Sequence, residues 1–497
     1  MTRPELMIIG DSLAQGCRSL SVKKDYCEQS YGVRIARSQR WEFDTPQHPR
    51  PILFDLEREI RNLVPSVLDS LITWKIFPGL INRIKTNIRD WIADLTSGNP
   101  ITDIDCFSNI GVAGFVVSDL YKTAGEFKKE ALEYISKEKL FDLDDVDFVK
   151  KIEPLHEMIN AAYTLNPSGT AENDKSAIDW VKIKKPRRLI VQILHNNPAK
   201  DGVSLFETGF AGEFTTFSYD DFAEDLDKLA QDLATLPPEI EEIYYFLLPK
   251  VGAVANLRPS SRPKNGYSRS YRPVLYPTPN RLSGEELSEA DNSIEQTNLE
   301  LKTRFRSIFE AVSKGNSKRL HFIDAYELFD EFDYKNTRDE DREIPIGKKR
   351  INNMPLDGEP RTIGPASKRK IIGYGLVEGG FQSVDGMHPS ALGYGVMATK
   401  VMDTMQLEYD KTQILNEAYH DDKLLTNFSR NVESIYHLIQ LVQGFMSEPE
   451  PNALADVQAS MAEDPMQLGA RGKSEKSLAA AGLMTLAVHS IVRKSGN

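Results

Sequence analysis

The sequence predicts an α/β fold in which a parallel sheet is covered on both faces by helices, that is, a three-layer sandwich. The prediction depends first on five short apolar runs, at residues 5–10, 104–108, 187–194, 242–248 and 320–324. These runs are apolar on both faces and are separated by segments long enough for helices, which is typical of buried parallel strands. The second observation is a clear amphipathic helix between two of the runs.

That helix lies in the stretch SYDDFAEDLDKLAQDLATL, residues 218–236. Its apolar residues recur at three- and four-residue spacing, at Phe222, Leu226, Leu229 and Leu233. Ser218 and Asp221 precede them as a capping box. A further helix is expected over residues 388–405.

The same pattern predicts the domain organisation. Residues 1–410 form the α/β domain, with long insertions at about 251–283, which is rich in Arg, Tyr and Pro, and at 335–372, which is charged and rich in Gly and Pro. Strand signals then stop, and residues 411–497 are expected to form a helical extension. Its apolar stretch at 477–492 predicts a packed helix or one that faces a protein partner or a second copy.

Composition excludes several classes of protein. A net charge of −12 argues against general nucleic-acid binding, which needs a positive surface. Three cysteines, Cys17, Cys27 and Cys106, are too few for a disulfide framework or a zinc site and fit a reducing compartment. We expect neither a signal peptide nor a transmembrane segment. The expected location is cytoplasmic, with export by a route that needs no signal left open.

A serine follows the first apolar run, in the stretch MIIGDSLAQG. Ser12 would stand at the carboxyl end of the first strand, the edge at which open parallel sheets bind ligands. Far downstream, SVDGMHPSALGYG places Asp385 three residues before His388, and Pro389 opens the expected helix. In a tight turn the carboxylate can bond one imidazole nitrogen and leave the other facing Ser12, as nucleophile, base and orienting acid require.

Together these stretches resemble the GDSL, or SGNH, hydrolase family of esterases and lipases. The resemblance implies a five-stranded, flavodoxin-like parallel sheet and four sequence blocks that supply Ser, Gly, Asn and Asp-x-x-His. The first block is matched by Gly10-Asp11-Ser12-Leu13 and the last by Asp385 with His388. The stretch NIGVAG resembles the second block, which implies that Gly114 and Ser12 donate backbone N–H groups to an oxyanion hole.

The third block departs from the family pattern Gly-x-Asn-Asp, because the chain reads ILHNNPAKDG. With Asn197 as the oxyanion-hole asparagine, His195 stands where the glycine is expected and Pro198 where the aspartate is expected. A shift by one residue would select Asn196 instead, and both alignments stay open. We expect Asp11 to be a turn or cap residue beside the site, with His195 and Asn196 close to it.

The resemblance implies a serine esterase or lipase that hydrolyses carboxylic esters through an acyl-enzyme, without a metal or organic cofactor. Ser12 would attack the carbonyl, His388 would take its proton and Asp385 would fix the imidazole tautomer. Two alternatives stay open: an acyltransferase with the same triad, and a catalytically inactive binding protein of the same fold. The expected substrate is a small-molecule, lipid or sugar ester whose acyl chain length the sequence does not define.

Overall fold

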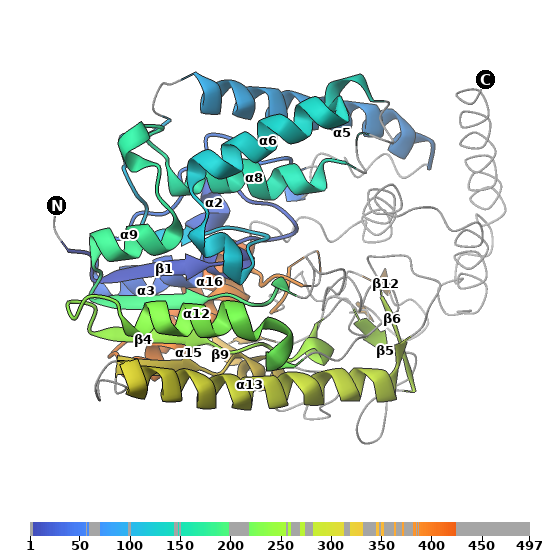
Figure 1. Cartoon of the computed structure of the whole chain (residues 1–497). Helices are drawn as coiled ribbons and strands as arrows, with labels where there is room; N and C mark the ends of the chain where they lie inside the picture. Colours follow the sequence, from blue (N-terminus) through green and yellow to red (C-terminus); the bar gives the residue numbers. More distant parts are fainter. Residues whose placement is uncertain are drawn as a thin grey trace.

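Five parallel strands form the central sheet of the structure, which is a computed structural model (Figure 1). In the order in which they pair, the strands are β2 (Asn109–Gly111), β1 (Leu6–Gly10), β3 (Arg188–Gln192), β4 (Glu242–Phe246) and β8 (Leu320–Ile323). Gly10 of β1 lies opposite both Gly111 and Gln192. The order in which strands are added reverses at β1, and doubly wound sheets open a ligand crevice at such a point.

The structure does not describe every residue of the chain. The described residues are 3–55, 57–58, 70–97, 101–143, 148, 151–197, 218–254, 257–259, 269–273, 282–312, 319–331, 344–346, 349–351, 362–363, 370–371, 381–383, 385 and 387–423. Most of the insertion expected at 335–372, the helix expected at 477–492 and Pro198 lie outside them.

The strands expected at 5–10, 187–194, 242–248 and 320–324 are confirmed, with ends that differ by one or two residues. The strand expected at 104–108 is wrong, because β2 begins only at Asn109. The backbone N–H groups of Ser108 and Asn109 donate to the carbonyl of Asp44 (2.8 and 3.1 Å), so the chain enters β2 from a loop contact. The apolar side chains of Cys106 and Phe107 are buried without strand pairing.

Alternate residues of the strands enter two separate cores, one on each face of the sheet. In β1, Met7 and Ile9 belong to one core, and Leu6 and Ile8 belong to the other. The first core is covered by α5 (Ser70–Thr96), α6 (Ala124–Glu138), α8 (Glu153–Leu165), α9 (Ala177–Lys184), α12 (Ala223–Ala234) and α13 (Gly284–Val312). The second is covered by α3 (Tyr31–Gln39), α14 (Ala325–Glu331), α15 (Ala391–Thr404) and α16 (Lys411–Lys423).

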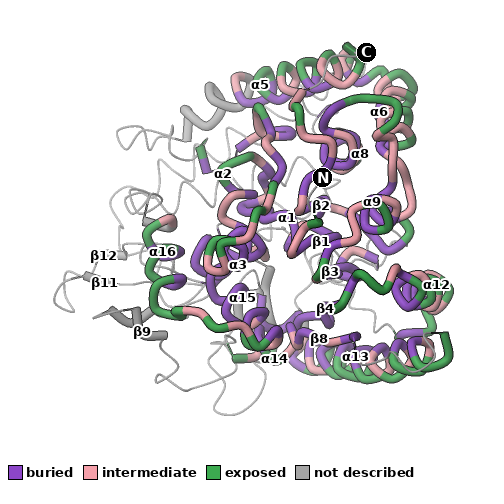
Figure 2. The backbone as a smooth tube through the Cα atoms, turned by 90° about the vertical axis from the view of Figure 1, so that its left-hand side faces the viewer, coloured by how far each residue is buried: buried purple, intermediate pink, exposed green. Residues whose placement is uncertain are grey.

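The strands therefore run buried between two layers of helices (Figure 2). Short elements complete the described part of the chain: α1 (Ser12–Gln15), α2 (Lys24–Cys27), and the 3₁₀ turns η1 (Val117–Tyr121), η2 (Leu140–Asp142), η3 (Ala171–Asn173), η4 (Tyr219–Phe222) and η5 (Val251–Ala253). None of the helices within the described ranges is long and apolar enough to cross a membrane.

The insertions contribute small antiparallel sheets. Within the one expected at 251–283, β5 (Leu257–Pro259), β6 (Ser270–Pro273) and β7 (Leu282–Ser283) pair in that order. Within the one expected at 335–372, β9 (Ile344–Ile346) pairs with β10 (Lys349–Ile351), and β11 (Thr362–Ile363) pairs with β12 (Lys370–Ile371).

Two helix starts can be compared with the sequence. The capping interaction expected before α12 is confirmed, since the carboxylate of Asp221 accepts from the N–H (2.6 Å) and the hydroxyl (3.2 Å) of Ser218. The helix expected from 388 begins later, at Ala391, because Ser390 caps it by accepting from the N–H of Gly393 (3.0 Å). Gln382 and Pro389 instead pair in an isolated bridge, and His388 lies just before it on a loop and not on a helix.

The boundary expected near residue 410 also needs correction. Helix α16 packs against α15, and its residues Ile414, Leu415 and Ala418 belong to the same buried core as β1. Asp421 of α16 forms an ion pair with the buried Arg34 of α3 (2.8 Å). The α/β domain therefore includes α16, and residues 424–497 lie outside the described part.

Candidate active site

The turn after β1 places Ser12 at the carboxyl edge of the sheet. Gly10 ends the strand with φ +151°, and a Cβ there would lie 1.9 Å from the carbonyl oxygen of Gln192, so only glycine fits. The N–H of Asp11 donates to that carbonyl (2.9 Å), and its carboxylate accepts from the N–H of Leu13 (3.1 Å). Asp11 therefore caps α1, as expected, and Ser12 is the partly exposed first residue of that helix.

The loop before α15 brings the expected acid and base together. Oδ2 of the fully buried Asp385 lies 2.7 Å from Nδ1 of His388 and accepts from the N–H of Leu20 (2.8 Å). Its Oδ1 accepts from the hydroxyl of Ser383 (3.1 Å) and from the N–H groups of Met387 and His388 (2.9 Å each). Five donors therefore hold one carboxylate, and the acid–base pair predicted from Asp-x-x-His spacing is present.

The two members of this pair shift each other's protonation. Burial by itself would raise the pKa of Asp385, but His388 and the N–H of Met387 hold that pKa below its ordinary value. Burial would lower the pKa of His388, but the charges of Cys17 and Asp385, and hydrogen bonds to both, raise it well above its ordinary value. The imidazole of His388 is therefore a stronger base than an ordinary histidine.

The contact between nucleophile and base differs from the expectation. Within the described ranges the hydroxyl of Ser12 makes no hydrogen bond, whereas Cys17 lies close enough to His388 to raise the pKa of that histidine. The N–H of Cys17 donates to the carbonyl of Ser12 (2.9 Å), and the hydroxyl of Tyr394 donates to the carbonyl of Cys17 (2.6 Å). Ser12 and the thiol thus belong to one turn beside His388, and serine–histidine contacts are often long before substrate binds.

Two backbone donors are available near Ser12. Gly114 follows β2 with φ +99°, and a Cβ there would lie 2.9 Å from Oε2 of Glu157. Both the backbone and the available space therefore require glycine at this position. In the part of the chain that the structure describes, the N–H groups of Gly114 and Ser12 donate to no other group.

The structure distinguishes between the two asparagines that the alignment left open. Nδ2 of Asn196 donates to the carbonyl of Phe115 (3.1 Å), so one of its two N–H groups is already used. Oδ1 of Asn197 accepts from the N–H of Val117 (3.0 Å), which leaves its Nδ2 without a partner among the described residues. The geometry therefore favours Asn197 as the side-chain donor, and both amides tie the turn after β3 to the loop that follows Gly114.

His195, in the position of the family glycine, pairs with Asp11. Its Nδ1 lies 2.6 Å from Oδ2 of Asp11, and both side chains are buried. Its Nε2 is buried and has no partner within the described ranges. The preceding Leu194 has φ +105°, which is unusual for a residue other than glycine. This pair connects the turn of Ser12 to the turn of Asn197.

Gln15 is a site residue that sequence reasoning missed. Its Oε1 accepts from the N–H of Ala113 (3.0 Å) and from Nδ2 of Asn160 (2.8 Å), and its Nε2 donates to Oδ1 of Asn160 (2.8 Å). All three residues are buried, so α1 directly holds the loop of Gly114. The available signal was an amide directly after the apolar residues Leu13 and Ala14, because a buried amide needs partners.

His156 of α8 was also not recognised as part of this region. Burial and the positive charge of the neighbouring His388 lower the pKa of His156 to about 4. Its Nε2 is buried and has no partner in the described part of the chain. His156 is therefore neutral at pH 7, and among the described residues the titratable groups that interact with His388 include Asp385, Cys17 and His156.

No set of three or more His, Cys, Asp or Glu side chains within the described ranges is arranged to hold a metal ion. Compared with known proteins, the chain matches no family model, no curated protein and no solved structure. The function has to be argued from the geometry of the site. That geometry combines a serine, a paired acid and base, and three N–H donors at one edge of a parallel sheet.

Proposed function

We propose that the protein is a serine hydrolase of the GDSL or SGNH type that cleaves carboxylic esters. One observation carries the proposal: Asp385 pairs with His388, and the turns that carry Ser12, Gly114 and Asn197 are joined to one another by hydrogen bonds. Ser12 follows β1, Gly114 follows β2 and Asn197 follows β3. The Asp385–His388 pair is joined to the hairpin that follows α1 by the N–H of Leu20, eight residues after Ser12.

In the proposed reaction, the Ser12 hydroxyl transfers its proton to Nε2 of His388 as its oxygen bonds to the ester carbonyl carbon. The tetrahedral intermediate expels the alcohol, which takes that proton from His388. A water molecule then attacks the acyl-Ser12 ester, with His388 again as base, and the acid leaves. Asp385 keeps the proton of Nδ1 in place, so that Nε2 is the acceptor in both steps.

The N–H groups of Ser12 and Gly114 and Nδ2 of Asn197 would bind the oxyanion of each intermediate. Donors that have no competing partner need no rearrangement when the charge develops. One such donor contributes about 3–4 kcal/mol to transition-state stabilisation in comparable sites. If an alcohol replaces water in the second step, the same machinery performs acyl transfer.

A second candidate is favoured by the effect of Cys17 on the pKa of His388. In this case Cys17 is the nucleophile, and Cys17, His388 and Asp385 form the triad of a thiol hydrolase. Ser12 would then only supply a backbone donor. The two candidates differ in which side chain becomes acylated.

The experiment is labelling with a fluorophosphonate probe, together with hydrolysis of a panel of p-nitrophenyl esters. We expect labelling of the wild type that is abolished in Ser12→Ala and His388→Ala and retained in Cys17→Ala. Ser168→Ala is the matched control, because Ser168 is a buried serine with several hydroxyl contacts away from the site. Ester hydrolysis that survives in Ser12→Ala and is lost in Cys17→Ala would instead support the thiol hydrolase. Folded wild type without labelling or hydrolysis would refute both.

A further inference from the structure

Two successive residues beside the site, Ser19 and Leu20, have a left-handed backbone, with φ 52° and 54°. Arg18 and Ser21 close a two-residue hairpin around them, with N–H to carbonyl distances of 3.1 and 2.9 Å. Such turns normally use Asn or Gly, because a β-carbon is unfavourable at positive φ. Strain of this kind persists only where the surrounding structure enforces it, and it concentrates at functional sites.

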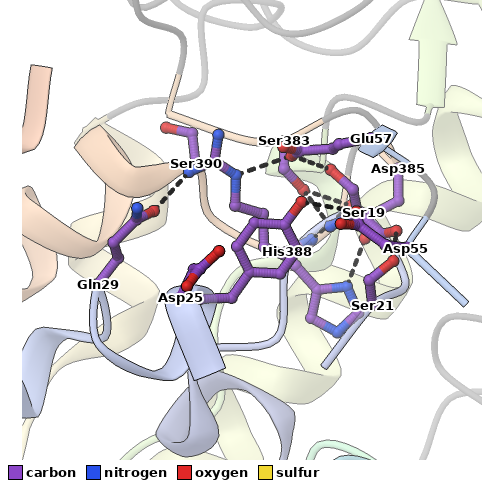
Figure 3. Close-up of polar contacts among 12 residues, drawn as sticks. Ser19, Ser21, Asp25, Gln29, Asp55, Glu57, Ser383, Asp385, His388 and Ser390 are labelled. Atoms are coloured by element: carbon purple, nitrogen blue, oxygen red, sulfur yellow. Dashed lines mark hydrogen bonds and ion pairs between the residues drawn. The ribbon is translucent and has the colours of Figure 1, made fainter. Parts of the chain in front are cut away.

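One side of this turn contacts the catalytic acid. The N–H of Leu20 donates to Oδ2 of Asp385 (2.8 Å), and the N–H of Ser19 donates to the hydroxyl oxygen of Ser383 (2.9 Å). That hydroxyl in turn donates to Oδ1 of Asp385 (3.1 Å). The left-handed conformation therefore delivers two successive N–H groups to residues 383 and 385, and both oxygens of the carboxylate are fixed. Figure 3 shows Ser19, Ser383 and Asp385 close together.

The other side of the turn is fixed to a buried ion pair. The hydroxyl of Ser19 donates to Oε1 of Glu57 (2.7 Å), and Nε of Arg18 donates to the same oxygen (2.8 Å). The side chains of Arg18 and Glu57 are 2% and 0% exposed. The other end of the guanidinium donates to Oε1 of Gln29 (2.9 Å), so Arg18 is held from two directions.

We infer that Ser383, Ser19 and Glu57 are positioning residues, which hold Asp385 in the orientation in which it bonds His388. Ser383 acts directly on the carboxylate, whereas Ser19 and Glu57 act through the strained turn. The Asp-x-x-His block contains none of these residues, and Ser19 is 364 positions from Ser383. The inference rests on the proposed function, because Asp385 needs a fixed orientation only if His388 is a base.

The test compares Ser383→Ala and Ser19→Ala with the wild type by two measurements. The first is the rate constant of fluorophosphonate labelling as a function of pH. We expect a fall of about ten- to fiftyfold for Ser383→Ala and a smaller fall for Ser19→Ala, because the first loses a hydrogen bond to a charged group. Ser383→Thr keeps the hydroxyl and should retain most of the rate, and Ser168→Ala is the control.

The second measurement is the pKa of His388, followed by NMR of ¹⁵N-labelled histidine. A carboxylate free to rotate pairs less well with the ring, so we expect the pKa of His388 to fall in Ser383→Ala and Ser19→Ala. A merely structural role would lower the thermal stability and leave that pKa unchanged. Wild-type labelling with rates and pKa unaltered in both variants would overturn the inference and leave the proposed function intact. If the wild type is not labelled, the proposed function fails and the NMR titration alone decides about the positioning residues.

Discussion

Replacing Asp385 with asparagine tests the site most directly, because the side chain keeps its shape and loses one acceptor. In the wild type, Oδ1 accepts from three donors and Oδ2 from the N–H of Leu20 and from Nδ1 of His388. The amide of Asp385→Asn can place its oxygen at the Oδ1 position and keep the first three bonds. Its NH₂ group then faces the N–H of Leu20 and the ring of His388.

Two consequences follow from this geometry. The partly buried N–H of Leu20 loses its acceptor, which costs about 1 kcal/mol of stability. The imidazole can restore its own contact only by moving its proton from Nδ1 to Nε2. Nε2 then cannot accept the proton of Ser12, and the wrong tautomer lowers the rate about 10⁴-fold in triads of this kind.

The stability effect also has a defined pH dependence. Because the pKa of Asp385 is lowered, this residue stabilises the folded state at pH values above its ordinary pKa, about 3.9. This stabilisation is lost as the pH falls through the lowered pKa. Because the pKa of His388 is raised, this residue stabilises the folded state at pH values below its ordinary pKa, about 6.5. This stabilisation is lost as the pH rises through the raised pKa. The free energy of unfolding of the wild type should therefore exceed that of Asp385→Asn by the largest amount at about pH 5–6.

The assay combines urea unfolding at several pH values with the labelling rate of the folded fraction. Asp174→Asn is the matched control, because Asp174 accepts from the N–H of Gly125 (2.7 Å) far from the site and the amide oxygen can keep that bond. Labelling of Asp385→Asn within tenfold of the wild type would refute the reasoning. It would mean that His388 works without an orienting acid, or that it is not the base.

Three further predictions concern the donors and the base. Gly114→Ala puts a Cβ at φ +99° and 2.9 Å from Glu157, so we expect the labelling rate to fall about 100-fold, and normal labelling would exclude Gly114 as an oxyanion donor. Asn197→Leu should lower kcat for ester hydrolysis about 10²- to 10³-fold with little change in KM, whereas a change in KM alone would assign Asn197 to substrate binding. Because the pKa of His388 is raised and the base must be neutral, kcat/KM should increase with pH through a kinetic pKa above the ordinary value of about 6.5. A kinetic pKa at or below the ordinary histidine value would show that Asp385 does not raise the pKa of His388 in solution.

Local patterns were sufficient for much of the fold. Apolar runs located four of the five strands, and the capping box of Ser218 marked the start of a helix. The prediction of a strand at 104–108 was wrong, because apolar residues such as Cys106 and Phe107 can be buried in a loop as well as in a strand. Pairing of the backbone, not burial of the side chain, decides which residues form β2, and pairing is a long-range property.

The contacts of the candidate site also separate into local ones, which the sequence predicted, and long-range ones, which it did not. The three-residue spacing of Asp385 and His388 is local, so the sequence predicted their contact correctly. The alignment of the third block left Asn196 and Asn197 equivalent, and only the partners Phe115 and Val117 separate them. The roles proposed for all these residues remain predictions until the labelling experiment is made.

By itself, the sequence determined the parallel sheet, the position of Ser12 after its first strand and the pairing of His388 with a nearby carboxylate. The last two depend on residues a few positions apart, and the sheet was predicted from the apolar pattern within each short run. Only the tertiary structure decided that Asp11 pairs with His195, that Gln15 holds the loop of Gly114, and that Cys17 is the thiol beside His388. These contacts join segments up to several hundred residues apart, and which buried polar groups meet depends on how the whole chain packs around the sheet.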